Sequence, residues 1–492
     1  MALLSKINNQ NLVTNYLAPF IFGAINFLSF APFDLKFLII VSYGYIAFLF
    51  NNYLSYSTLF IRLFMWGFAF WIFGTGWLIV SIYYYGNLTI ILSLISIILL
   101  SSFLAVVFIC PLVFFKNFIS NSHTRMRGLV FASCLLTLDL LRHFLFGGFP
   151  WLFPGLITID TFYQGGIPFI GIIGMSFFIY YVTFFFVNNL VRGSGIKIII
   201  FIILFSLSYV DTPTKKNLEN KIDVNLVQPA IDLNTKYSLQ SSEDILAILF
   251  RYSVHQPKIL NIWPETPFPF DSSHPAMDKV REYLIENDIS VIGGSWRFEE
   301  GKLYNTLEIY NNGEHYKKRH LVPFGEFIPL SSLFKGLFDI LGLPMSYISK
   351  GTDLKELEIN GHKFISAICF DIAYPFSYIN LDNSYEFIVN ISNDTWFGGS
   401  YGPSQHFQIT RARAIELDKF ILRATNDGIS AIIDNNGTVV DKIEKGLAGN
   451  LIGSIYTSPD KSFYSRIGWW LSLLIPCFIM FLTIFKRNKI DI

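Results

Sequence analysis

The sequence predicts an α-helical membrane bundle of eight spans joined to an α/β domain. Hydrophobic residues make up 52% of the 492 residues and charged residues only 15%, which is far from the usual composition of soluble proteins. Apolar stretches of about 20 residues, long enough to cross the hydrocarbon of a bilayer, recur along the chain. Between the last two stretches, short β-branched or aromatic runs alternate with amphipathic runs, a pattern typical of α/β structure.

Seven apolar stretches precede the α/β segment and one follows it. They begin near Leu12, Leu35, Leu59, Leu88, Gly128, Gly166 and Ile196, and the last runs from Ile467 to Phe485. With a cytoplasmic N-terminus, the inner loops and ends carry ten lysines and arginines and the outer loops two. This bias predicts an inner-membrane protein with both termini cytoplasmic. We expect a membrane domain of seven helices at 1–211, a catalytic domain at 212–462, periplasmic in a Gram-negative cell, and a last span with its tail at 463–492.

The α/β segment contains separate strand and helix signals. The sequence Asp434-Asn435-Asn436-Gly437 lies between two β-branched runs and predicts a hairpin turn. Helices are expected at Ser242–Val254, Met277–Glu286 and Gln405–Asp418. Strands are expected at Val224–Val227, Ile259–Trp263, Ser290–Gly293, Leu303–Tyr310, Phe364–Cys369, Phe387–Ile391, Ile429–Ile433 and Thr438–Lys442.

Charge and motif content exclude several classes of protein. The formal net charge is only +1, so no overall field favours nucleic acid as a partner. No Cys/His cluster has metal-ligand spacing and no glycine-rich phosphate loop occurs, so the sequence predicts neither a metal nor a cofactor. Three of the four cysteines, Cys110, Cys134 and Cys477, lie in apolar runs, which leaves Cys369 alone in the α/β segment.

Three polar residues follow strand-like runs, where active sites of α/β sheets collect. Cys369 ends one run, Glu265 follows a run that Pro264 stops, and Lys318 lies in a basic run that leads through a Pro-Phe-Gly turn to Glu326. An isolated strand cysteine is more often inert packing than a nucleophile. A carboxylate base that deprotonates the thiol, and an ammonium that stabilises the thiolate and an oxyanion, would make it reactive.

The motifs around these residues resemble the nitrilase superfamily and, within it, the membrane-embedded apolipoprotein N-acyltransferase family. The resemblance covers nearly the whole chain, including the segment 149–152 in the membrane part. The matching motifs are Trp263-Pro264-Glu265, the stretch from Lys318 to Glu326, Cys369, Asn393-Asp394-Thr395-Trp396-Phe397-Gly398 and Gly402-Pro403-Ser404-Gln405-His406.

The resemblance implies an α-β-β-α sandwich and a two-step acyl transfer. Glu265 would be the general base, Lys318 the oxyanion stabiliser and Cys369 the nucleophile, with Glu326 as a supporting carboxylate. Cys369 would take an acyl chain from a phospholipid such as phosphatidylethanolamine. The resulting thioester would then pass the chain to the α-amine of the diacylglyceryl-cysteine of an apolipoprotein.

The sequence departs from the family pattern near the expected substrate contacts. Phe370-Asp371 stands where the family often has Tyr-Glu, Asp139 replaces an expected glutamate, and Tyr237 replaces an expected tryptophan. These changes place the substrate contacts in question more than the reaction type, and Phe370 and Asp371 are expected to support the site. The expected substrate contacts are Trp151, Tyr237, Asn393, Trp396, Phe397 and His406.

Other interpretations stay open from sequence alone. A membrane-anchored carbon-nitrogen hydrolase would use the same three catalytic residues and let water resolve the acyl-enzyme. A membrane scaffold or transporter would need none of them. Asp139 and Arg142 lie three residues apart on one helix face and are either functional or a structural ion pair, and the spacing of Arg413 and Glu416 favours a structural pair.

Overall fold

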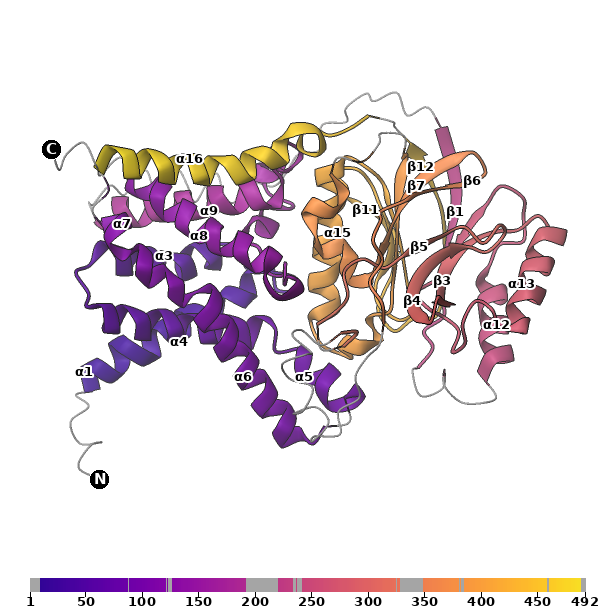
Figure 1. The fold of residues 1–492 in the computed structure, drawn as a ribbon, viewed down its shortest axis with the longest axis horizontal. Coiled ribbons are helices and arrows are strands. Elements are labelled where there is room, and N and C mark those ends of the chain that lie inside the picture. Colours follow the sequence, from indigo (N-terminus) through magenta and orange to yellow (C-terminus); the bar gives the residue numbers. More distant parts are fainter. Residues whose placement is uncertain are drawn as a thin grey trace.

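The computed structural model has a helical bundle at one end and a layered α/β part at the other (Figure 1). The residues described are 9–86, 88–120, 122, 126–191, 220–232, 236, 241–323, 325–327, 348–379, 381, 385–457 and 460–487. The first and last described helices, which begin at Asn9 and end at Arg487, lie on the bundle side, and α16 (Trp469–Arg487) runs along the bundle.

Five helical stretches are long and apolar enough to cross a membrane: Tyr56–Gly74, Ile90–Ser120, Arg127–Gly147, Phe162–Asn189 and Tyr464–Thr483. Two shorter apolar stretches, Val13–Ser29 and Leu38–Asn51, lie where the first two spans were predicted. The predicted span near Ile196 lies outside the described residues. The chain is therefore a membrane protein, and five of the eight predicted spans meet the length criterion within the described residues.

The bundle is built from one N-terminal run of helices and the C-terminal helix. Its main helices pack in pairs, α2 with α4, α4 with α6, and α8 with α9 and α16. The helices are α1 (Asn9–Leu12), α2 (Ala18–Ala24), α3 (Leu38–Asn51), α4 (Tyr56–Gly74), α5 (Leu78–Val80), α6 (Ile90–Phe108), α7 (Lys116–Ser120), α8 (Arg127–Phe144), α9 (Ile167–Val191) and α16.

The α/β part contains two six-stranded sheets that face each other. The first has the order β12-β1-β2-β3-β4-β5 and the second β11-β10-β9-β8-β7-β6. The strands are β1 (Asn220–Gln228), β2 (Leu260–Ile262), β3 (Ser290–Glu299), β4 (Lys302–Ile309), β5 (His315–Lys317), β6 (Glu356–Ile359), β7 (His362–Ile368), β8 (Phe387–Ser392), β9 (Ile421–Thr425), β10 (Ser430–Ile433), β11 (Val439–Ile443) and β12 (Gly449–Thr457).

Helices cover the outer faces of both sheets, which gives the predicted α-β-β-α layering. The helices α12 (Ser241–Tyr252) and α13 (Pro275–Glu286) lie outside the first sheet, and α15 (Gly402–Leu417) lies between the second sheet and the bundle (Figure 1). Alternation along β7 explains this, because Phe364 and Ile368 enter the core between the sheets while Ile365 and Ala367 face the bundle side. The core of the bundle therefore continues through α15 to the second sheet.

All eight predicted strands and all three predicted helices of this part occur, with shifted ends. The predicted turn at 434–437 joins β10 to β11, and Gly437 adopts φ +76° there. Four strands were not predicted: β5 and β6 have only three and four residues, and polar residues interrupt the apolar pattern of β9 (Arg423) and β12 (Asn450 and Ser454).

The bundle and α15 are joined at a break in α9. Gly171 adopts φ +66° inside this helix, and a side chain there would collide with the ring of Tyr464. The break leaves the backbone N–H of Ile172 without an intrahelical partner, and Glu416 on α15 accepts it at 2.6 Å. Arg413 forms an ion pair with the same buried carboxylate, which confirms the predicted structural pair.

Removal of this carboxylate is expected to destabilise the whole protein. Glu416→Ala leaves a buried guanidinium and a buried N–H unpaired, at a cost of about 3–5 kcal/mol. Thermal unfolding in detergent, followed by tryptophan fluorescence, should therefore begin several degrees lower. The control is Glu282→Ala, which removes an exposed carboxylate from α13. Equal unfolding temperatures for the two variants would contradict the role of Glu416.

Candidate active site

Cys369 lies on a sharp turn directly after β7. Its φ of +48° is in the left-handed region, which is strained for a residue with a side chain. The next residues form a short helical turn, Cys369–Ala373. The thiol is half-buried and unpaired with any cysteine. The turn therefore presents a single side chain at the carboxyl end of a central parallel strand, where β7 pairs with β8.

Three groups hold the carboxylate of Glu265. Its Oε1 atom accepts a hydrogen bond from Asn305 Nδ2 at 2.7 Å and lies 3.3 Å from Lys318 Nζ. Its Oε2 atom accepts from the backbone N–H of Asn393 at 2.8 Å. Glu265 is only 6% exposed, so these contacts fix the position of the carboxylate in a site that excludes most water.

Lys318 lies between two carboxylates. Its Nζ atom is 2.8 Å from Glu326 Oε1 and 3.3 Å from Glu265 Oε1, and the side chain is 1% exposed. Glu326 also accepts from the backbone N–H of Val322 at 2.8 Å, which fixes the turn predicted after the basic run. The site therefore brings together Glu265, Lys318, Glu326 and Cys369 from four separate segments.

Burial and neighbouring charges determine the protonation states of Lys318 and Cys369 in the resting site. Burial acts to lower the pKa of Lys318, but Glu265 and Glu326 outweigh it and raise that pKa well above its usual value. Burial, followed by Glu265, raises the pKa of the Cys369 thiol, while Lys318 acts in the opposite direction. The lysine is therefore a fixed cation and the cysteine rests as a thiol, which needs a base before it can attack.

Asp371 anchors the turn of Cys369 to the segment that carries Lys318. It accepts from the backbone N–H of His320 at 2.7 Å, from the Tyr316 hydroxyl at 3.0 Å and from the backbone N–H of Ile368 at 3.2 Å. Burial raises the pKa of Asp371 to about 6, against the opposing effects of Lys318 and these donors. Both carboxylate oxygens of Asp371, two residues after Cys369, thus accept hydrogen bonds from the protein itself.

A second buried network lies behind Cys369. His406 Nε2 is 3.1 Å from the carbonyl oxygen of Cys369, and Arg423 Nη2 is 2.8 Å from Asp394 Oδ2. Ligand atoms of Cys369, Asp394 and His406 lie within 4.8 Å of one another, a spacing that could hold a metal ion. Asp394 and His406 are already engaged, however, since Asp394 pairs with Arg423 and both ring nitrogens of His406 have partners. The donor set therefore fits a hydrogen-bonded network better than a metal centre.

Aromatic side chains from the bundle lie against the turn Cys369–Ala373, called the nucleophile turn below after the role predicted for Cys369. Trp151, buried beneath the junction, lies 6.3 Å from Phe370 and 5.8 Å from His406 between ring centroids. The indole N–H groups of Trp151 and Trp77 both donate to Gln405 Oε1, at 2.7 and 3.1 Å. The predicted contact residue Trp151 therefore lies beside the site, although it comes from the membrane part of the chain.

The other predicted contact residues have different surroundings. Asn393 positions Glu265 through its backbone, and its side chain accepts from Thr395. The ring of Phe397 packs against Trp77, with 4.6 Å between the ring centroids. Trp396 is 45% exposed and packs against Tyr85 at 4.8 Å between ring centroids. The segment 393–397 therefore contacts both Glu265, the predicted base, and the bundle. Tyr237 lies outside the described residues.

Asp139 and Arg142 form a buried ion pair of 2.7 Å near the C-terminal end of α8. Arg142 also donates to the carbonyl oxygen of Trp151 at 2.6 Å, and the Tyr180 hydroxyl donates to Asp139 at 2.5 Å. Of the two interpretations left open by the sequence, the contacts favour the structural one, because the pair holds the segment that carries Trp151.

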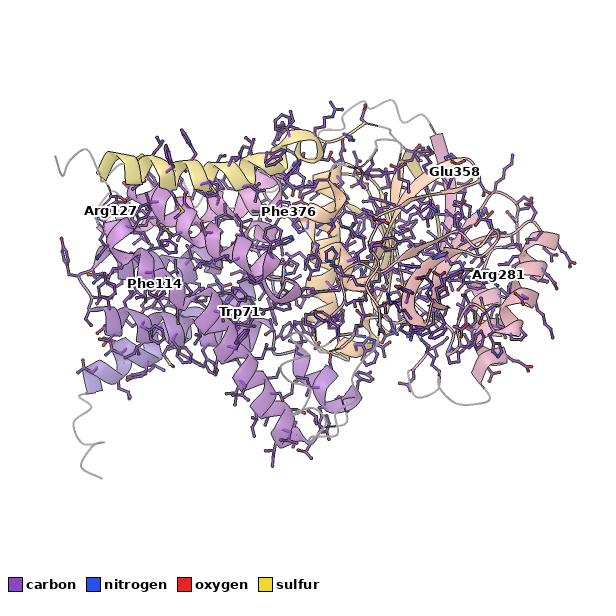
Figure 2. All side chains as sticks on the ribbon, in the orientation of Figure 1. Trp71, Phe114, Arg127, Arg281, Glu358 and Phe376 are labelled. Atoms are coloured by element: carbon purple, nitrogen blue, oxygen red, sulfur yellow. The ribbon has the colours of Figure 1, made fainter. Side chains whose placement is uncertain are left out.

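Sequence reasoning missed several residues of the site. Asn305 and Gln405 bind Glu265 and the two tryptophans, while Asp394 and Arg423 support His406. One signal was available for Asn305, since it is a polar residue inside a predicted strand and lies in the interior. Phe376, labelled in Figure 2 where the bundle meets the α/β part, packs against His143 and Trp469 and was also missed.

The two-sheet layering and the Glu265, Lys318 and Cys369 arrangement define a carbon-nitrogen hydrolase fold, and the family model described as Carbon-nitrogen hydrolase matches residues 226–456. The model described as Apolipoprotein N-acyltransferase N-terminal domain matches residues 22–185. An apolipoprotein N-acyltransferase of Haemophilus influenzae is 30% identical over 100% of this chain and 99% of its own length.

Two further relatives give the same result. The apolipoprotein N-acyltransferases of Haemophilus ducreyi and Pseudomonas syringae pv. tomato are each 28% identical, over 98% and 93% of this chain and 98% and 94% of their own lengths. The chain therefore belongs to the apolipoprotein N-acyltransferase family. It is an acyltransferase of the nitrilase superfamily, and the resemblance seen in its motifs is confirmed.

The raised pKa of Cys369 predicts an unusual alkylation profile. Because only the thiolate reacts, the rate of iodoacetamide labelling in detergent should keep rising about tenfold per pH unit up to about pH 9.5. An unperturbed thiol would begin to level off near pH 8.5. Peptide mass spectrometry separates Cys369 from the other three cysteines. A plateau at or below about pH 8 would show that the resting residue is a thiolate.

Proposed function

We propose that this protein transfers an acyl chain from a membrane phospholipid to the α-amino group of the diacylglyceryl-cysteine of apolipoproteins, through a thioester on Cys369. The observation that carries this proposal is the buried arrangement of Glu265 and Lys318, 3.3 Å apart, beside the strained turn of Cys369. Family membership supports lipoprotein N-acylation as the reaction. The roles of single residues and the phospholipid donor are our inference from the site.

In the first half-reaction, Glu265 accepts the proton of the Cys369 thiol. The sulfur attacks the carbonyl carbon of the acyl ester, and the charge that develops on the carbonyl oxygen is stabilised by Lys318, with the backbone N–H of Phe370 as a further candidate donor. The bond to the glycerol oxygen breaks, and protonated Glu265 returns the proton to that oxygen. The products are a thioester and a lysophospholipid. Glu326 orients Lys318 from the side opposite Glu265.

In the second half-reaction, the α-amine attacks the thioester carbonyl. Glu265 accepts a proton from the amine, the carbon–sulfur bond breaks, and the proton returns to the leaving sulfur. An amide and a free thiol result, so the enzyme is restored without any cofactor. Phosphatidylethanolamine is the donor we propose, and the chain needs no metal for either step in this scheme.

The position of the site at the junction with the bundle supports a lipid donor. Trp151 of the membrane part packs against Phe370, and Phe397 packs against Trp77 of the bundle and against His406. We therefore propose that Trp151 and Phe397 line the path of the acyl chain. Asn393, Trp396 and Tyr237 are the remaining candidates for substrate contacts. We also propose the predicted division at 1–211, 212–462 and 463–492, in the inner membrane, with the catalytic domain in the periplasm and both termini in the cytoplasm.

Incubation with phosphatidylethanolamine and no acceptor should load Cys369 with one acyl chain. Peptide mass spectrometry should find an acyl adduct that hydroxylamine removes, and a diacylated lipopeptide should discharge it with formation of an amide. Glu265→Gln keeps the shape of the side chain but removes the base, so the loading rate should fall about 10²- to 10⁴-fold.

Two variants separate this mechanism from the alternatives. Cys369→Ala should carry no adduct, whereas Cys477→Ala, which removes an exposed cysteine of α16, should be loaded like the native chain. Rapid discharge by water, with no acylated peptide, would favour the carbon-nitrogen hydrolase. Absence of an adduct on native Cys369 under all lipid conditions would overturn the proposed function.

Topology can be tested with a cysteine introduced at an exposed position of β11. Asp441→Cys should react with a membrane-impermeant maleimide added to cells with a permeabilised outer membrane, because the proposal places β11 in the periplasm. The native chain, treated in parallel, gives the background from Cys477. Labelling only after lysis of the inner membrane would reverse the proposed orientation.

A further inference from the structure

The backbone at Cys369 needs support from outside its own turn. A left-handed φ on a residue with a side chain is strained and persists only where surrounding contacts enforce it. Asp371 supplies one such contact by accepting from the backbone N–H of Ile368, just before the nucleophile. The carbonyl oxygen of Cys369 is held on the other side, by His406 Nε2 at 3.1 Å.

The surroundings of His406 fix which nitrogen carries the proton. A carbonyl oxygen can only accept, so Nε2 must donate to Cys369. Nδ1 lies 3.1 Å from Arg423 Nη2, which can only donate, and 3.1 Å from Asp394 Oδ1, which can only accept. Burial and then Arg423 lower the pKa of His406, which keeps the ring neutral. Arg423, held by its ion pair with Asp394 at 2.8 Å, donates to Nδ1 of the neutral ring and so favours the tautomer that donates to the nucleophile turn.

We propose that His406 is a positioning residue that holds the Cys369 turn in its reactive geometry, rather than a contact for the substrate. This role rests on the proposed function of Cys369 as the nucleophile. Both ring nitrogens of His406 are engaged within the protein, and the side chain is about 1% exposed, so neither nitrogen is available to a lipid or an amine.

The membrane part of the chain contributes to the position of His406. The ring packs 5.8 Å from Trp151, and the preceding residue, Gln405, accepts the indole N–H groups of Trp151 and Trp77. One turn of α15 therefore contacts the tryptophans of the bundle through Gln405 and the nucleophile turn through His406. A displacement of Trp151 and Trp77 would therefore move Gln405 and the adjacent His406, and His406 would in turn move the backbone of Cys369.

The test compares two substitutions of similar size. His406→Met fills the space but removes the donor, whereas His406→Gln retains an amide N–H that can reach the Cys369 carbonyl. Single-turnover loading of Cys369 is measured at several phosphatidylethanolamine concentrations. We expect the maximal rate to fall about 100-fold in His406→Met, because small displacements of reacting groups have effects of this size. The half-saturating lipid concentration should change less than about twofold, and His406→Gln should recover to within about tenfold of native.

The control is Ser404→Ala, on the same turn of α15, whose half-buried side chain makes no hydrogen bond among the described residues. It should load at the native rate. Thermal unfolding of each variant in detergent shows whether it is folded. A loss of loading in His406→Gln as large as in His406→Met, in folded protein, would overturn the role of the N–H donor.

The remaining outcomes are also decisive. A raised half-saturating concentration with an unchanged maximal rate would make His406 a substrate contact and overturn the proposal. Failure of both His406 variants to fold would assign the residue to folding and overturn it too. A native protein that forms no thioester on Cys369 would instead overturn the proposed function. If the native protein and His406→Met both load Cys369 at the normal rate, only the positioning role would be overturned.

Discussion

The site depends on one buried cation. Lys318 is held between Glu265 and Glu326 in a region from which water is nearly excluded, and neither carboxylate would be tolerated there without it. The ion contacts fix three segments at once, because the two acids follow a strand and a turn that are distant in sequence. Burial makes the nearby thiol dependent on a base, since Lys318 acts to lower the pKa of the Cys369 thiol. In the proposed mechanism the charge of Lys318 stabilises an oxyanion, and burial keeps Cys369 protonated until Glu265 accepts its proton.

The second requirement is a rigid link between the bundle and the α/β part. Glu416 completes the broken helix α9 at Ile172, Arg142 holds the carbonyl oxygen of Trp151, and Gln405 binds two indole N–H groups. In the contacts of Glu416 and Gln405 a buried polar group of the α/β part satisfies a buried polar group of the bundle, so separation of the parts would leave these groups unpaired. In the proposed reaction, this link fixes the position of the Cys369 thiol relative to the bundle along which the acyl chain would arrive.

Much of this architecture could be predicted because it depends on local patterns. Alternating apolar residues specified eight strands, and the three catalytic candidates each followed a strand or a turn. The supporting residues could not be found in this way. Asp394 and Arg423 are 29 residues apart, and Gln405 meets Trp151 across 254 residues, so only the packed fold brings them together. Short helices at Val13–Ser29 and Leu38–Asn51 also show that hydropathy locates a span better than it sets the length of its helix.

The substitution of Phe370-Asp371 for the pair expected from the family can now be interpreted physically. Both Asp371 oxygens accept donors from the protein, two of them backbone N–H groups on either side of the site. Asp371, although shorter than the glutamate expected from the family, therefore still reaches its partners, because they lie in the adjacent turn and in the neighbouring loop. Phe370 keeps its ring against Trp151 and Tyr374, where packing rather than a hydroxyl is used. The departure changes the means by which the turn is anchored, while Cys369 remains between Glu265 and His406.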